Sequence, residues 1–191
     1  MPFAFPQRND DIEDAIDTYH SKVLLFAAAS NQSEKKLGFP ACLPEVTCIY
    51  SNQTPTIQSA FCKLGREGKY NFSTIGEEVD GAWPSESADE KRTKRETGTS
   101  CSTAIAAGVA ALILEFSTQT GRGRVDRAKK LKKKSVMEKV LFECMTERST
   151  TGVYNLIEPW KLLSGFDGKQ PKPLLSIANT ISDQINEVSP N

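Results

Sequence analysis

An uninterrupted apolar run over residues 23–29, VLLFAAA, constrains the fold more than any other stretch of this chain. The run has the length of a strand, and the polar residues Ser30, Asn31 and Gln32 follow it directly. A strand without polar alternation is buried on both faces, which is typical of a parallel sheet covered by helices on either side. Residues 46–50 and 71–76 predict two further short strands. The expected fold is therefore α/β, with three layers and a mostly parallel sheet flanked by helices.

Helix patterns precede and follow these strands. Residues 9–21 predict a helix, because Ile12 and Ile16 fall on one face and Asn9 can cap the first turn. Residues 98–119 start with glycine and small hydroxyl residues and continue as a long apolar helix, and residues 135–147 predict another helix. Residues 84–97 are highly charged, which predicts an exposed loop.

Length and charge bound the domain organisation and the partners. A chain of 191 residues suits one domain, and a formal net charge of zero gives no overall field toward nucleic acid or an acidic membrane. We expect residues 1–163 to form the domain, with residues 121–134 as a basic surface loop within it. Residues 164–191 are rich in proline and serine, which predicts a flexible C-terminal tail.

Cysteine usage favours a reducing compartment. The five cysteines include no C-x-x-C pair, and His20 is the single histidine. This pattern favours neither a zinc site nor a disulfide framework, so no metal and no cofactor is predicted. No signal peptide is visible, and the longest apolar run, residues 104–114, is too short to span a bilayer. A soluble, cytoplasmic protein is the default expectation.

Three segments in order carry a resemblance: FAAASN at 26–31, NFSTIGEEVDGAWP at 71–84 and GTSCSTAIAAG at 98–108. Together they resemble the C-terminal part of the catalytic domain of subtilisin-like serine proteases (subtilases), including the family's fungal intracellular members. FPAC at 39–42 and MPFAFP at 1–6 resemble further family segments. The resemblance is close to about residue 120 and looser to residue 163.

The resemblance implies a role for seven residues. Ser100 would be the nucleophile, at the start of a helix whose N–H groups and dipole face a developing oxyanion. Asn31 would complete the oxyanion hole with its side-chain amide. The residues implied to bind substrate, a peptide or protein, are Phe3, Ala4, Ala28, Ala29 and Ser30.

Each of these residues also has a plainer interpretation. Ser100 alone could be a helix N-cap, and Asn31 alone could be a turn residue at a strand end. The family pattern is also altered at four positions. Ala104 replaces a proline, Cys101 replaces a larger residue, and Ser30 and Ala4 stand where glycine is common, so their extra atoms could narrow the pocket.

The family's other two triad members are not recognisable in this sequence. In subtilases an Asp-Ser/Thr-Gly motif supplies the aspartate and a His-Gly-Thr motif supplies the histidine, and neither string occurs among the 191 residues. His20 lies on the predicted helix before the oxyanion strand, where an exposed histidine is the favoured interpretation. Asp80 has no motif support, and the aspartates on the same helix as His20 are interpreted as cap and surface charges: Asp10, Asp11, Asp14 and Asp17. The domain's N-terminal part is thus expected elsewhere, on the same or another polypeptide.

Two functions stay open on the sequence. The first is a serine endopeptidase whose base and orienting carboxylate come from outside this chain. The second is an inactive subtilisin-like remnant that acts as an interaction module. The basic run over residues 122–134 could also be a nuclear address or a nucleic-acid contact, although a solvated surface loop is favoured. Aromatic residues do not interleave with the run, so base stacking has no support.

Overall fold

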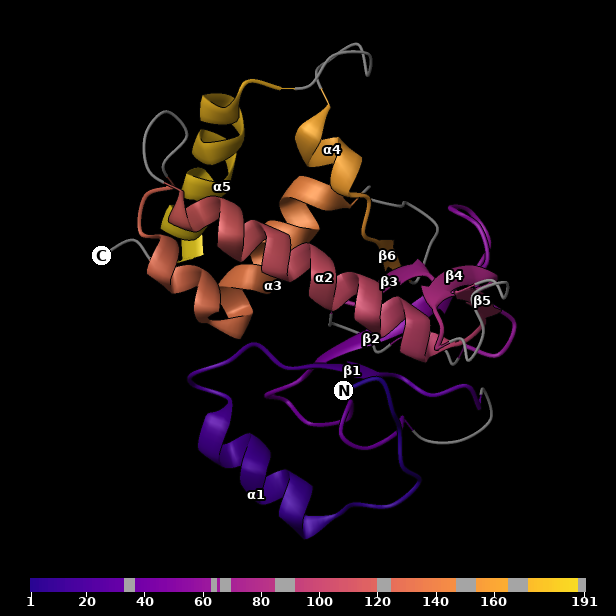
Figure 1. The fold of residues 1–191 in the computed structure, drawn as a ribbon. Helices are drawn as coiled ribbons and strands as arrows, with labels where there is room; N and C mark the ends of the chain where they lie inside the picture. Colours follow the sequence, from indigo (N-terminus) through magenta and orange to yellow (C-terminus); the bar gives the residue numbers. More distant parts are fainter. Residues whose placement is uncertain are drawn as a thin grey trace.

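The computed structural model describes residues 1–32, 37–62, 65, 70–84, 92–119, 125–146, 154–164 and 172–188. Its centre is a sheet of four parallel strands in the order β1-β2-β3-β6 (Figure 1). The strands are β1 (Phe26–Ala28), β2 (Thr47–Asn52), β3 (Phe72–Ile75) and β6 (Asn155–Leu156). The α/β class and the parallel sheet predicted from the sequence are confirmed.

The strands bury side chains on both faces. Phe26, Ile49 and Phe72 point into one apolar cluster, in which Ile49 and Phe72 are paired across β2 and β3. Ala27 and Cys48, a register pair of β1 and β2, belong to a second cluster on the opposite face. Successive residues of a strand alternate between faces, so each core receives every second residue. This double burial is why residues 26–29 are apolar throughout, whereas Val23, which precedes the strand, is 47% exposed.

Helices cover the two faces unequally (Figure 1). On one face lie α2 (Thr99–Thr118), α3 (Lys134–Met145), α4 (Pro159–Leu163) and α5 (Leu174–Val188). On the other lies α1 (Asp10–Tyr19), which buries Ile16 and whose first turn is capped by Asn9, the acceptor of the Ile12 N–H at 3.0 Å. The three-layer arrangement is therefore present.

The charged stretch before α2 is not simply a loop. Strands β4 (Val79–Ala82) and β5 (Thr93–Glu96) form an antiparallel pair, with an Arg95–Asp80 ion pair at 3.2 Å across it. The prediction of a loop over 84–97 is wrong for Thr93–Glu96, and residues 85–91 lie outside the described part. All four residues of β5 are exposed, so the strand carries no apolar alternation that the sequence could reveal.

The prediction of a flexible tail is wrong for residues 174–188. Helix α5 buries Ile177, Ile181 and Ile185 in the same cluster as α3 and the sheet. Residues 125–134 are also packed against the domain. Val125 and Leu131 are buried, and the 3-10 helix η1 (Ala128–Lys132) packs beside α2 and α3. Arg122 and Arg124, the start of the basic run, lie outside the described residues.

Candidate active site

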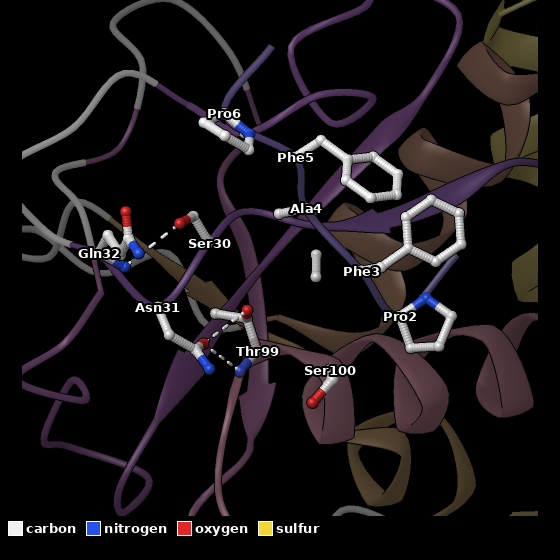
Figure 2. A pocket seen from close by; sticks show the side chains of 12 residues that line it. Pro2, Phe3, Ala4, Phe5, Pro6, Ser30, Asn31, Gln32, Thr99 and Ser100 are labelled. Carbon is white, nitrogen blue, oxygen red and sulfur yellow. Dashed lines mark hydrogen bonds between the residues drawn. The ribbon is translucent and has the colours of Figure 1, made fainter. Parts of the chain in front are cut away.

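A cavity of about 380 Å³ lies where β1 ends and α2 begins (Figure 2). One wall is residues 2–6, and the rest comes from the end of β1, from Gly38 and from the first turn of α2. The lining residues are Pro2, Phe3, Ala4, Phe5, Pro6, Ala28, Ser30, Asn31, Gln32, Gly38, Thr99 and Ser100. The carboxyl ends of parallel strands are the edge at which α/β proteins bind their ligands.

The side chain of Asn31 is held by the first residue of α2. Its Oδ1 accepts the backbone N–H of Thr99 at 2.9 Å and the hydroxyl of Thr99 at 2.8 Å (Figure 2). With Oδ1 held, Nδ2 faces Gly98, where it lies 2.8 Å from the ideal Cβ position of that residue. In the described part of the chain Nδ2 has no hydrogen-bond partner, so it is a free donor.

Gly98 is required at this turn. Its φ of +155° is a conformation that residues with side chains rarely adopt, and a Cβ atom would meet Asn31 Nδ2 at 2.8 Å and Ser100 Oγ at 3.2 Å. The glycine thus leaves open the space between the amide and the hydroxyl.

Ser100 sits in the first turn of α2, half-buried, on the cavity wall. Neither its hydroxyl nor its backbone N–H has a hydrogen-bond partner among the described residues. The first N–H groups of a helix have no partner within it, and the helix dipole adds positive potential there. A hydroxyl, a backbone N–H and an amide N–H therefore border one small space, an arrangement that can stabilise an oxyanion formed next to the hydroxyl.

The turn that presents Asn31 is strained at Ser30. Its φ is 130°, and its hydroxyl accepts the backbone N–H of Gln32 at 3.2 Å. A positive φ outside glycine costs free energy and persists only where the surroundings enforce it. Here the sharp turn directs Asn31 toward Thr99 just after the strand has ended.

The opposite wall is the apolar segment of residues 2–6, which is hydrogen-bonded to the turn before Pro40. Phe5 and Phe39 exchange two backbone hydrogen bonds of 2.8 and 2.9 Å. Gly38 approaches Ala4 so closely that an added Cβ would lie 2.6 Å from the Ala4 methyl carbon. The rings of Phe3 and Phe5 are 5.2 Å apart and remain 39% and 42% exposed, so this wall offers apolar surface to a ligand.

The structure brings six of the seven sequence-predicted site residues to this cavity: Phe3, Ala4, Ala28, Ser30, Asn31 and Ser100. Ala29 is fully buried in the second apolar cluster and does not line the cavity. The catalytic and substrate-binding roles of these residues stay predictions. Thr99 was missed by the sequence reasoning, although the GTS string that marks Ser100 contains it.

No histidine or carboxylate is among the described residues that line the cavity. His20 ends α1, on the other face of the sheet from α2 (Figure 1). Asp80 pairs with Arg95 on the β4–β5 hairpin. Within the described part of the chain, the Ser100 hydroxyl therefore has no proton acceptor beside it.

Comparison with known proteins gives a consistent family and fold. The profile of the subtilase family matches residues 4–147. No curated protein matches the chain. The prenylagaramide maturation protease PagA has a similar structure, with a TM-score of 0.62 at 23% identity, over 95% of this chain and 60% of PagA.

Two further solved structures agree. The patellamide maturation protease PatA aligns with a TM-score of 0.58 at 22% identity, over 97% of this chain and 60% of the PatA chain. The PatG macrocyclase in complex with peptide aligns with a TM-score of 0.60 at 19% identity, over 94% of this chain and 49% of the PatG chain. The chain thus spans about half to three-fifths of the structures it resembles.

Proposed function

The chain belongs to the subtilase family of serine proteases, and from that premise we propose that it carries the nucleophile half of a serine endopeptidase site. Ser100 Oγ attacks the carbonyl carbon of a peptide bond, and its proton passes to a base from the rest of the domain. The carbonyl oxygen becomes an oxyanion, which Asn31 Nδ2 and the Ser100 backbone N–H stabilise by donating hydrogen bonds to it. The base then returns the proton to the leaving amine.

One observation carries this proposal: Asn31 and Ser100, from separate segments, meet across Gly98, and their donors and the hydroxyl have no hydrogen-bond partner among the described residues. A plain helix N-cap does not require this, since a capping side chain accepts N–H groups of its own helix. The substrate is a peptide or protein held between residues 2–6 and Ser30. The peptide complex of the PatG macrocyclase, a protein of similar fold, supports this substrate class.

The base and its orienting carboxylate come from the part of the domain that this chain does not span, on the same or another polypeptide. The similar structures support this division, because nearly all of this chain overlies only 60% of PagA. We propose that the assembled enzyme is cytoplasmic, because all five cysteines are free thiols, as is typical of proteins in a reducing compartment.

The alternative is a catalytically inactive member that binds a partner through the same half-fold. It is favoured by the absence of a histidine or carboxylate among the described cavity residues. Fluorophosphonates, which phosphonylate only activated serines, separate the two functions. Native protein isolated with its partners should yield a tryptic peptide phosphonylated at Ser100, and Ser100→Ala should abolish that peptide. An unmodified Ser100 in the native assembly would overturn the endopeptidase proposal in favour of the interaction module.

A further inference from the structure

Two buried hydroxyl side chains join the start of α2 to the end of β3. Thr74 Oγ1 donates to the Ser102 carbonyl oxygen at 3.0 Å, and Ser102 Oγ donates to the Thr74 carbonyl oxygen at 3.1 Å. Thr74 Oγ1 also lies 3.3 Å from the Ile75 carbonyl oxygen, but a hydroxyl has one proton and the bond to Ser102 is shorter. The two residues therefore form a reciprocal pair between the sheet and the helix that carries Ser100.

Ser102 uses its hydroxyl differently from other hydroxyl residues of α2. A serine or threonine within a helix commonly donates to a carbonyl oxygen three or four residues earlier in the same helix. Thr103 donates in this way to Thr99, and Ser117 donates to Leu114, each at 2.7 Å. Ser102 instead donates out of the helix to a strand.

The sheet-facing side of α2 shows that packing alone does not need this hydroxyl. Ala106 and Ala110 continue the row that Ser102 begins, at intervals of four residues, and both are buried in the cluster between α2 and the sheet. The polar member of the row stands at the end of the helix that carries Ser100. A buried hydroxyl costs free energy unless it is hydrogen-bonded, so its place here indicates that the bond to β3 is the reason for the serine.

The backbone beside the pair is joined as well. The Gly98 N–H donates to the Gly76 carbonyl oxygen at 2.7 Å, so the residue before α2 is bonded to the residue after β3. Gly76 has no room for a side chain, because an ideal Cβ would clash with the hydroxyls of Ser51 and Ser102 and would lie 2.8 Å from the Gly98 carbonyl oxygen. The helix start is therefore in direct contact with the strand end.

The first turn of α2 is thus held to two different strands. At the end of β1, Asn31 accepts two hydrogen bonds from Thr99, and on β3 Thr74 is bonded to Ser102. Ser100 lies between these two anchor points. Because successive residues of a helix are about 100° apart, Ser100 points away from Ser102 and toward the cavity. A rotation of the helix start would turn the Ser100 hydroxyl and N–H away from the Asn31 amide.

We propose that Thr74 and Ser102 are positioning residues for the nucleophile, whose reciprocal hydrogen bonds hold the first turn of α2 at the rotation that aligns Ser100 with Asn31 Nδ2. The inference rests on the proposed function, because this alignment matters only where Ser100 attacks a carbonyl carbon. Neither Thr74 nor Ser102 is among the described residues that line the cavity, so both act through α2. Oxyanion bonds strengthen in the transition state, so misalignment lowers kcat and leaves KM unchanged.

Steady-state peptide hydrolysis by the native assembly tests the pair. Thr74→Val keeps the branched shape without the hydroxyl, and Ser102→Ala removes the other hydroxyl. Each should lower kcat about fivefold, the scale of one hydrogen bond, and the double variant should lower it by more than about tenfold. Thr74→Ser keeps the hydroxyl and should retain kcat. Ser117→Ala, which removes a buried hydroxyl at the far end of the same helix, should also retain it.

Amide hydrogen exchange in the same assemblies separates this inference from the proposed function. Exchange of the Gly98 N–H should become about fivefold faster in Thr74→Val and Ser102→Ala and stay unchanged in Ser117→Ala. Faster exchange in an assembly that hydrolyses no peptide would remove the endopeptidase and leave the pair only as an anchor of α2. In an active assembly, unchanged kcat in Thr74→Val and Ser102→Ala would overturn the inference and keep the endopeptidase. An equal fall of kcat in Thr74→Ser or Ser117→Ala would also overturn it.

Discussion

Thr99 controls how the Asn31 amide is presented, and it does so through a bond that one substitution can remove. Thr99→Val keeps the branched shape and the backbone N–H bond but loses the 2.8 Å hydroxyl bond to Oδ1. A lost hydrogen bond of about 1 kcal/mol corresponds to roughly a fivefold change. In the native assembly we expect kcat to fall about fivefold with KM unchanged, because Nδ2 is aimed less well while substrate contacts persist. Steady-state peptide hydrolysis measures both constants.

Thr99→Ser is the matched control, because it keeps the hydroxyl and should retain kcat. If Thr99→Val and Thr99→Ser lower kcat equally, the methyl packing matters rather than the bond, and Thr99 is not a positioning residue. A rise in KM alone would point instead to a substrate contact.

Ser30 stores strain that glycine should release. At φ 130° a side chain costs about 1–3 kcal/mol, whereas glycine adds about 0.5–1 kcal/mol of unfolded-state entropy. Ser30→Gly should therefore raise the free energy of unfolding by about 1 kcal/mol, measured by urea denaturation. Ser30→Ala keeps the strained Cβ and loses the bond from Gln32, so it should not stabilise the protein. Equal stability of Ser30→Gly and Ser30→Ala would show that the turn is unstrained.

The sequence could predict Ser100 and Asn31 better than the hydrogen bonds that hold them in place. Ser100 and Asn31 stand in strings typical of subtilases, so their proximity followed from the resemblance. The bonds from Thr99 to Asn31 join segments far apart in the chain, and no local pattern reports them. The resemblance assigned Ala29 to the pocket together with Ala28, but successive residues at a strand end face opposite sides.

At the scale of elements, α5 contributes buried surface that the core needs. Ile181 is 1% exposed in the cluster that joins α5, α3 and the sheet. Ile181→Ala removes buried methyl groups and leaves a cavity, which costs about 2–5 kcal/mol. We expect a corresponding fall in the free energy of unfolding. Leu175→Ala, on the exposed face of the same helix, should change it by less than about 0.5 kcal/mol. If both variants behave alike, α5 is not docked on the core.

The elements that were predicted correctly are those whose own residues repeat a pattern. The strand at residues 26–28 is apolar throughout, and α1 places Ile12 and Ile16 on one face. Strand β5 is fully exposed and is held by pairing with β4, so its four residues show no period. Helix α5 does carry isoleucines at helical spacing, but the proline and serine residues around it suggested a tail instead.

At the scale of the molecule, two buried thiols and a half-buried phenol make the free energy of unfolding depend on pH in the alkaline range. Burial raises the pKa of Cys62 to about 11, that of Cys144 to about 12 and that of Tyr154 to about 12. Above pH 9 the unfolded chain loses protons that the folded chain retains, so the free energy of unfolding falls as pH rises. We expect the urea midpoint to drop steadily between pH 9 and about pH 12.

Removing one of these groups should make that decline less steep. Cys144→Ala leaves a small cavity and lowers the midpoint near neutral pH, but it removes one titrating thiol. Its midpoint should therefore fall less between pH 9 and pH 12 than that of the unaltered chain. A midpoint that stays constant from pH 8 to pH 11 in the unaltered chain would contradict the burial of these groups.

The division of the site between this chain and the rest of the domain predicts an unusual result for the purified chain. A serine hydroxyl is a weak nucleophile without an adjacent base, and no described cavity residue can take its proton. In other serine proteases that lose a triad member, the oxyanion hole and substrate binding still give about a thousand- to ten-thousandfold acceleration over water. Any hydrolysis by the purified chain should therefore depend on Asn31 and not on Ser100.

Peptide hydrolysis by three purified proteins checks this: the unaltered chain, Ser100→Ala and Asn31→Ala. Ser100→Ala should equal the unaltered chain, because the hydroxyl is not activated, and Asn31→Ala should be slower, because an oxyanion donor is gone. In the native assembly the order reverses, and Ser100→Ala becomes the more damaging change, since the base now makes the hydroxyl the attacking group. If Ser100→Ala already abolishes hydrolysis by the purified chain, then this chain supplies its own proton acceptor and the proposed division of the site is wrong.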